Sequence, residues 1–210
     1  MRNTLLFLTI CCPYFSIAQK TVTDCTINYT VSAVKKNANA DPSSLDIYNG
    51  TTVTLFLKGV NSRIETSTPL GNITFIYNSS TESGVRLREN GANKFLEKYD
   101  KAKLALENKK FEGAKFIKDT TTKEIAGYKC NQGTVLLTNG LKIKIFYTID
   151  VQALNTNFDF QFSLVPGFVL EYIRETDEAI ITNTATKCSL SPVPASKFEV
   201  PKTGYREIVK

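Results

Sequence analysis

GTTVTLFLKGVNSRIETSTPLGNITFIYNSSTESGVRLRE, residues 50–89, is the stretch that decides the fold, because apolar and polar residues alternate along four short segments of it. In the first segment Val53, Leu55 and Leu57 share one face, since successive side chains of a strand point to opposite sides. Turn residues such as Pro69-Leu70-Gly71 separate the segments. The stretch therefore predicts four β-strands joined by tight turns.

Two residues break this alternation. Phe56 and Ile76 are large apolar side chains on the otherwise polar face. A sheet with apolar side chains on both faces needs a cover on both. The core supplies one cover, and a helix, a partner or a ligand would supply the other.

The remaining chain adds further strand patterns and one helical pattern. Asn139-Gly140 between two alternating runs is a strong hairpin signal. Phe158, Phe160 and Phe162 also alternate. Further strands are expected at residues 25–34, 114–120, 123–130, 133–138, 141–150, 168–175 and 178–189, with a brief edge pairing at 198–200.

One amphipathic helix is expected within residues 92–110. Phe95, Tyr99, Ala102 and Leu106 follow one another at helical spacing and form a single apolar stripe. Many strands with short turns indicate a barrel or a sandwich, and an inserted helix favours a sheet curved around it. We therefore predict a mainly β, single-domain fold: a curved antiparallel half-open barrel of about ten or eleven strands with one covering α-helix.

Residues 1–18 have the pattern of a secretory signal peptide. Arg2 is followed by a short apolar run and by Ser16-Ile17-Ala18, a small-x-small cleavage site. A lipoprotein signal ending at Cys11 is the alternative, although Ile10 fits poorly before such a cysteine. We expect cleavage after Ala18, a folded domain at residues 19–210, and a periplasmic or secreted location in the cell envelope of a Gram-negative bacterium.

Composition argues against several functions. The chain has 26 basic and 20 acidic residues and a net charge of +6, with the two signs interleaved, so we expect no nucleic-acid partner, while peripheral contact with an anionic membrane stays open. It has no histidine and no glycine-rich phosphate loop before a helix. We therefore expect no enzyme activity, no metal and no cofactor.

Apolar residues in excess of what a one-sided sheet needs suggest a binding site. We predict that Phe56, Ile76, Phe146 and Phe162 line a concave apolar face with Arg63 at its rim. The function predicted from this is binding of an apolar ligand, such as a lipid or the acyl chain of a lipidated protein. The alternative is a secreted interaction or structural module whose core these side chains simply fill.

Three cysteines follow the predicted signal peptide: Cys25, Cys130 and Cys188. An oxidising compartment would allow one disulfide and leave one thiol. Spacing alone does not choose the pair.

Three motifs resemble a group of uncharacterised secreted Bacteroidota-type proteins related to the GLPGLI proteins. They are LKGVNSR at 57–63, IAGYKC at 125–130 and PGFVLEY at 166–172, although Leu164-Val165 replaces the usual residues before the proline. The C-terminal stretch SPVPASKFEVPKTGY, 191–205, is distantly similar to the ending of LolA/LolB-type lipoprotein carriers, whose early tryptophan this chain lacks. The resemblance implies a half-closed barrel with a helical lid and an apolar concave face able to hold acyl chains. It also implies a disulfide between Cys25 and Cys130, which would leave Cys188 free.

Overall fold

The computed structural model describes residues 20–36 and 45–208. The predicted signal peptide, residues 1–18, lies outside the described residues. The strands are β1 (Lys20–Val22), β2 (Asp24–Lys35), β3 (Thr52–Lys58), β4 (Asn61–Thr68), β5 (Gly71–Asn78), β6 (Ser83–Asn90), β7 (Asn93–Tyr99), β8 (Lys115–Ile125), β9 (Tyr128–Leu136), β10 (Lys142–Thr148), β11 (Val151–Ala153), β12 (Phe168–Glu175), β13 (Ala179–Ser189) and β14 (Arg206–Glu207). The helices are α1 (Lys101–Asn108) and the 3₁₀ turns η2 (Lys109–Phe111), η3 (Thr156–Phe158), η4 (Phe160–Phe162) and η5 (Ala195–Phe198).

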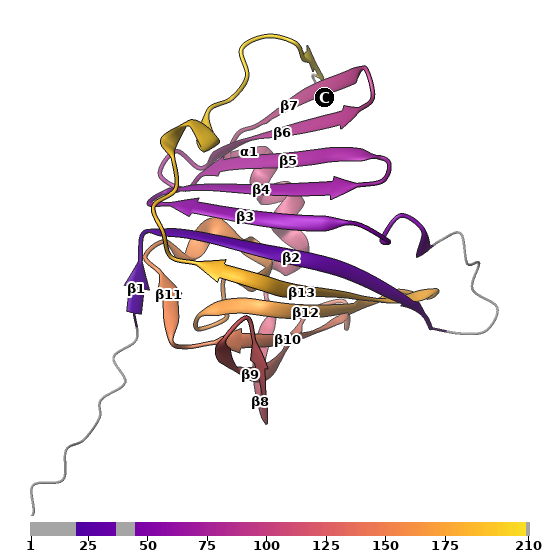
Figure 1. Ribbon diagram of the computed structural model, residues 1–210, viewed down its shortest axis with the longest axis vertical. Coiled ribbons are helices and arrows are strands. Elements are labelled where there is room, and N and C mark those ends of the chain that lie inside the picture. Colours follow the sequence, from indigo (N-terminus) through magenta and orange to yellow (C-terminus); the bar gives the residue numbers. More distant parts are fainter. Residues whose placement is uncertain (1–19, 37–44, 209–210) are drawn as a thin grey trace, which may run out of the picture.

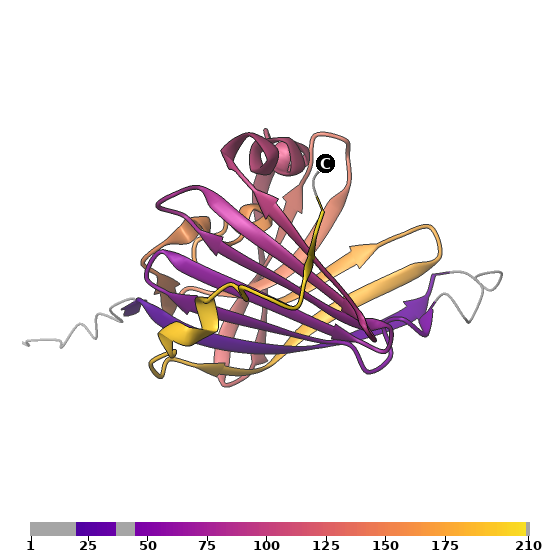
Figure 2. The same ribbon diagram turned by 90° about the horizontal axis from the view of Figure 1, so that it is seen from above.

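Twelve of these strands form one large sheet that does not close into a barrel. Its order is β14-β7-β6-β5-β4-β3-β2-β13-β12-β10-β9-β8, and β1 pairs with β11 in a separate parallel ribbon. The sheet curves, with α1 on one side and the C-terminal segment on the other (Figures 1 and 2). The mainly β prediction is confirmed at this level. The described part contains more strands than the ten or eleven expected, because several short ones gave no sequence signal.

The four predicted strands within residues 50–89 are β3 to β6. Their antiparallel register places Leu55 beside Ile64, and Ile64 beside Phe75. These side chains share the concave face. Gly71, the first residue of β5 directly after the Pro69-Leu70 turn, has φ +137°, and a Cβ there would lie 2.0 Å from the carbonyl oxygen of Glu89. The tight turn therefore requires glycine at this position.

The predicted helix over 92–110 is wrong in its first half, where residues 93–99 form β7. Phe95 pairs with Arg88 of β6 and Tyr99 with Gly84, so the first two residues of the supposed helical stripe belong to a β-hairpin. The helix α1 begins only after Asp100, whose carboxylate accepts a hydrogen bond from the backbone N–H of Lys103 at 2.8 Å. Leu104 is the buried residue of α1, whereas Leu106 is 73% exposed.

Two other local predictions are corrected. The alternating phenylalanines at 158, 160 and 162 lie in η3 and η4 rather than in a strand, because Asn155 and Asp159 accept hydrogen bonds from the backbone N–H groups two residues on. The chain also does not turn back at 120–123. Instead β8 continues to Ile125 with an irregularity in its pairing, and the turn falls at Ala126-Gly127.

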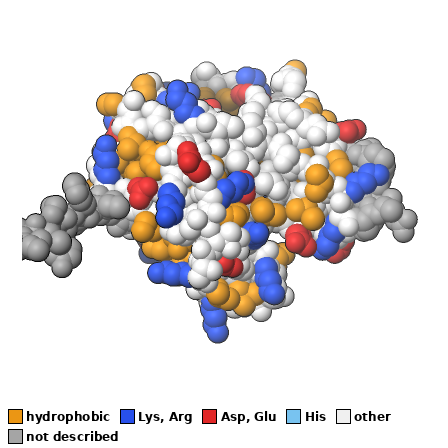
Figure 3. All heavy atoms as spheres, turned by 60° about the horizontal axis from the view of Figure 1, so that its bottom comes forward, with side chains coloured by type: hydrophobic (Ala, Val, Ile, Leu, Met, Phe, Trp, Pro, Cys, Tyr) orange, Lys and Arg blue, Asp and Glu red, His pale blue; other side chains and the backbone are white. Residues whose placement is uncertain are grey.

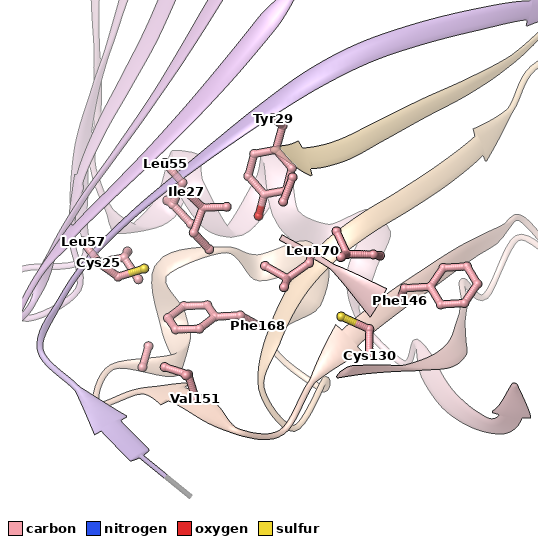
Figure 4. Packing of buried hydrophobic residues seen from close by; sticks show 13 residues of the cluster. Cys25, Ile27, Tyr29, Leu55, Leu57, Cys130, Phe146, Val151, Phe168 and Leu170 are labelled. Atoms are coloured by element: carbon pink, nitrogen blue, oxygen red, sulfur yellow. The ribbon is translucent and has the colours of Figure 1, made fainter. Parts of the chain in front are cut away.

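The main core fills the space inside the curve of the sheet. Figure 4 shows Cys25, Ile27 and Tyr29 of β2 with Leu55 of β3, facing Phe168 and other side chains from the opposite part of the sheet. Burying each large apolar side chain contributes roughly 1.5–3 kcal/mol. This core packs between the β2–β3 part of the sheet and the β12 part. A cleft remains between these two parts.

The second face of the sheet is covered by the C-terminal segment. Ile76, Leu87 and Leu96 form a small core with Phe198 and Tyr205, which are partly buried against it. The segment crosses β3 to β7 on the side opposite to α1 (Figure 1). Ile76 lies on the face that the sequence pattern marks as polar. The C-terminal segment of the same chain covers it there.

Candidate functional site: an apolar cleft on the concave face

The cleft is built by the regular apolar face of β2, β3 and β4. Tyr29 pairs with Val53, and Leu55 pairs with Ile64, so these four side chains form one continuous surface. The Tyr29 hydroxyl donates a hydrogen bond to the carbonyl oxygen of Val169 at 2.8 Å, which joins β2 to β12 across the cleft. This hydrogen bond therefore connects the apolar surface of β2 to β4, which is the floor of the cleft, to β12 on the opposite side.

The cover of this surface comes from η3, η4 and β12. The Phe158 ring lies 5.9 Å from the Phe168 ring, and the Phe162 ring lies 5.2 Å from the Tyr172 ring, both as tilted pairs. Such contacts stabilise by about 0.5–1.5 kcal/mol beyond the area that they bury. They fix the two 3₁₀ turns above the sheet.

Between floor and cover lies a cavity of about 60 Å³, and a groove of about 360 Å³ adjoins it. Val53, Ile64, Phe158, Asp159 and Tyr172 line both, which shows that the two spaces adjoin. A further pocket of about 300 Å³ lies beside the groove, under α1 and η4. The groove alone is within the usual size range of small-molecule sites, roughly 300–1,000 Å³.

The cavity is lined mainly by apolar side chains, whereas the wall of the groove is mixed and includes Thr66, Arg86, Glu107, Asn108, Asp159, Gln161 and Arg174. The Asp159 carboxylate lines both the cavity and the groove and accepts a hydrogen bond from the backbone N–H of Gln161. Burial raises the pKa of Asp159, although that hydrogen bond and the charge of Arg174 oppose the shift. Arg174 lines the groove as well, where it donates a hydrogen bond to Gln161 and lies over the Tyr172 ring. An apolar chain with a polar end matches this combination of walls.

The helix α1 is held over the groove by an ion-pair network. Glu97 of β7 is 6% exposed and pairs with Lys103 of α1 at 3.1 Å, while Arg86 of β6 pairs with Glu107 of α1 at 2.7 Å. The single proton of the Tyr99 hydroxyl lies between the two glutamates, with its oxygen 2.9 Å from a Glu97 carboxylate oxygen and 3.1 Å from one of Glu107. Sheet and helix are therefore joined by charges as well as by the buried Leu104.

The structure brings together three of the predicted site residues, but on the convex face. Phe56 pairs with Arg63, and Arg63 pairs with Ile76, on three neighbouring strands. Lys197 lies over the Phe56 ring, and Arg63 donates a hydrogen bond to the Lys197 carbonyl oxygen at 2.9 Å. The prediction that Phe56 and Ile76 line the concave face with Arg63 at its rim is corrected, because the C-terminal segment covers these residues on the convex face.

The other two predicted residues lie apart from each other. Phe146 is 6% exposed within the main core cluster, flanked by the ammonium groups of Lys123 and Lys144, and does not line the cavity or the groove. Phe162 does line the cavity. Phe56 and Ile76, which we predicted to line the cleft, break the alternation of their strands. The cleft is lined instead by Tyr29, Val53 and Ile64, which follow the alternation.

The cysteines are also arranged differently from the expected pair. The Cys25 and Cys188 sulfur atoms are 3.9 Å apart, whereas the Cys130 thiol lies within hydrogen-bonding distance of the Tyr128 carbonyl oxygen. All three are free thiols. In Figure 4 the side chains of Phe168 and Leu170 lie between Cys25 and Cys130. The neighbour of Cys25 is therefore Cys188.

A basic patch, a metal site and a membrane span are three further features that would indicate a function. On the face in Figure 3, Lys and Arg are interspersed with Asp and Glu and form no continuous basic patch. Within residues 20–36 and 45–208, no three His, Cys, Asp or Glu side chains gather as a metal site would need. In the same part of the chain, no helix has the length and apolar character that a membrane span requires.

Comparisons with known proteins identify no family. No family model matches the chain, and no curated protein matches it. Among solved structures, "Structure of PNGF-II in C2 space group" is similar with a TM-score of 0.49 and 11% identity, covering 87% of this chain and 30% of that one. "Crystal structure of MucB" is similar with a TM-score of 0.43 and 11% identity, covering 86% of this chain and 58% of that one. The chain spans less than two thirds of either, and at these scores neither likeness carries an argument.

Proposed function

We propose that this chain is a non-enzymatic protein of the cell envelope that binds an apolar ligand, a lipid or the acyl chain of a lipidated protein, in the cleft of a LolA-like half-barrel. The observation that carries the proposal is the cavity and the adjoining groove between the concave face and its helical cover. Ligand sites combine apolar walls with placed polar groups, and here the cavity supplies mainly apolar walls while the groove supplies both kinds. Asp159 and Arg174 would orient the polar end of the ligand. The signal-like residues 1–18 support a periplasmic or secreted location, and peripheral membrane contact is part of the proposal.

A second candidate is an interaction or structural module with a filled core. The observation that favours it is the size of the inner cavity, about 60 Å³, which is too small for an acyl chain by itself. In this case the groove would be a surface feature, and the chain would act through protein partners. The two candidates differ in whether a ligand enters between the sheet and η3.

Replacing Val53 with phenylalanine is expected to block the cleft. Val53 lines both the cavity and the groove, so the added ring would occupy the space that the ligand needs. We expect palmitate binding, measured by equilibrium dialysis with labelled palmitate, to weaken by a factor of about 5 to 150, because overpacking opposes occupancy by roughly 1–3 kcal/mol.

Thr52→Phe is the matched control. Thr52 neighbours Val53 on β3, is exposed, and lies on the other face of the strand. It should bind palmitate as the unmodified chain does. Equal binding by Val53→Phe and Thr52→Phe would place the ligand elsewhere, and no binding by the unmodified chain would favour the second candidate.

A further inference from the structure

Two of the three thiols in the described part of the chain lie side by side on neighbouring strands. Cys25 is near the start of β2 and Cys188 near the end of β13, and the register pairs Cys188 with Ile27. The side chains of residues 25 and 27 share a face, so the two thiols are diagonal neighbours on the concave side. Their sulfur atoms are 3.9 Å apart. A disulfide bond of about 2.0 Å would require the two sulfur atoms to move closer together.

The surroundings give the two thiols different roles. Cys25 is completely buried, whereas Cys188 is partly exposed. The hydrogen bond with Cys188, and then burial, raise the pKa of Cys25 well above its usual range. Hydrogen bonds from Cys25 and from the Tyr128 hydroxyl lower the pKa of Cys188, against the effect of burial. Cys188 is therefore the thiol that reacts first with an oxidant, and the buried Cys25 is the resolving cysteine.

From this geometry we propose that Cys25 and Cys188 form a redox-active dithiol that closes to a disulfide between β2 and β13, leaving Cys130 as the free thiol. The inference is independent of the proposed ligand. It replaces the Cys25–Cys130 pair that the family resemblance implied.

The oxidant is a small disulfide, and the reaction is a two-step exchange. The Cys188 thiolate attacks one sulfur of the small disulfide, and the other sulfur leaves as a thiolate that takes up a proton. The Cys25 thiol then gives up its proton, and its sulfur attacks the Cys188 sulfur and releases the second small thiol. Two protein thiols lose two electrons and two protons in total, and the small disulfide gains both and becomes two thiols.

The test is peptide mapping of the folded full chain. The protein is reduced, freed of reductant, incubated with oxidised glutathione, blocked with N-ethylmaleimide in denaturant and cleaved with trypsin. Cleavage after lysine separates Cys25, Cys130 and Cys188 into peptides 21–35, 130–142 and 188–197. We expect 21–35 joined to 188–197 as the main product, with 130–142 carrying the blocking group.

Two variants test which cysteines form the disulfide. Cys130→Ser should still give the joined peptides, and Cys188→Ser should return peptide 21–35 carrying the blocking group. A link between 21–35 and 130–142 in the unmodified chain would overturn the proposal. Recovery of all three peptides with blocked thiols after oxidation would overturn it as well.

Discussion

Truncation of Phe168 to alanine is expected to lower the free energy of unfolding by about 3–5 kcal/mol, the range for removing a fully buried aromatic side chain. Phe168 is 1% exposed, belongs to the main core cluster and contacts the Phe158 ring of η3. Its loss removes buried apolar area, leaves a larger cavity and frees the 3₁₀ turn that covers the cleft. Urea unfolding followed by circular dichroism measures the change.

Phe56→Ala is the matched control for that variant. Phe56 is half-buried on the convex face beneath Lys197, so we expect a loss of about 1.5 kcal/mol or less. Similar losses for the two variants would mean that the packing around Phe168 is not the principal core.

Glu97→Ala is expected to lower the free energy of unfolding at neutral pH by about 3 kcal/mol. This value is at the low end of the range for breaking a buried ion pair, because the positively charged partners of Glu97 are partly exposed to solvent. Glu97 accepts a hydrogen bond from the Tyr99 hydroxyl at 2.9 Å and pairs with Lys103, Arg86 and Arg88. Removing it leaves Lys103 of α1 without its partner on the sheet. Glu175→Ala, which breaks an exposed pair with Lys36, should change the free energy by less than about 1 kcal/mol.

The effect of Glu97→Ala should depend on pH. Burial raises the pKa of Glu97, but the hydrogen bonds from Tyr99 and Lys103 and the nearby positive charges outweigh it, so that the pKa is lowered overall. A carboxylate whose pKa is lowered in the folded state stabilises fully above its unfolded pKa, about 4.3, and loses that contribution as pH falls through the folded pKa. The difference between the unmodified chain and Glu97→Ala should therefore shrink below about pH 4. A difference that is constant between pH 7 and pH 3 would contradict the ion-pair explanation.

The sequence predicts the sheet well because its signals are local. The alternation at Val53, Leu55 and Leu57 and the turn residues around Gly71 act within a few residues, and β3 to β6 follow them. The helix prediction fails at residues 93–99 because pairing with β6 outweighs the chance spacing of Phe95 and Tyr99. The Asp100 cap then sets where α1 begins.

The site is harder to predict because it depends on contacts between distant segments. Phe56 and Ile76 look like ligand contacts in the sequence, yet residues 195–205 cover them, and no local pattern shows that this segment crosses the sheet. The approach of Cys25 to Cys188 depends in the same way on β2 pairing with β13. The ordinary alternation of Tyr29 and Val53 carried the correct signal for the cleft, but it could not show that space remains between these residues and η3.

The most direct measurement of the central claim is native mass spectrometry of the full chain purified without detergent, with lipid extraction of the same sample. We expect bound species of acyl-lipid mass that disappear on delipidation and return, one per chain, when palmitate is added. A chain that is free of lipid as purified and also fails to bind added palmitate would contradict it, and would mean that the cleft between β3 and η3 is closed.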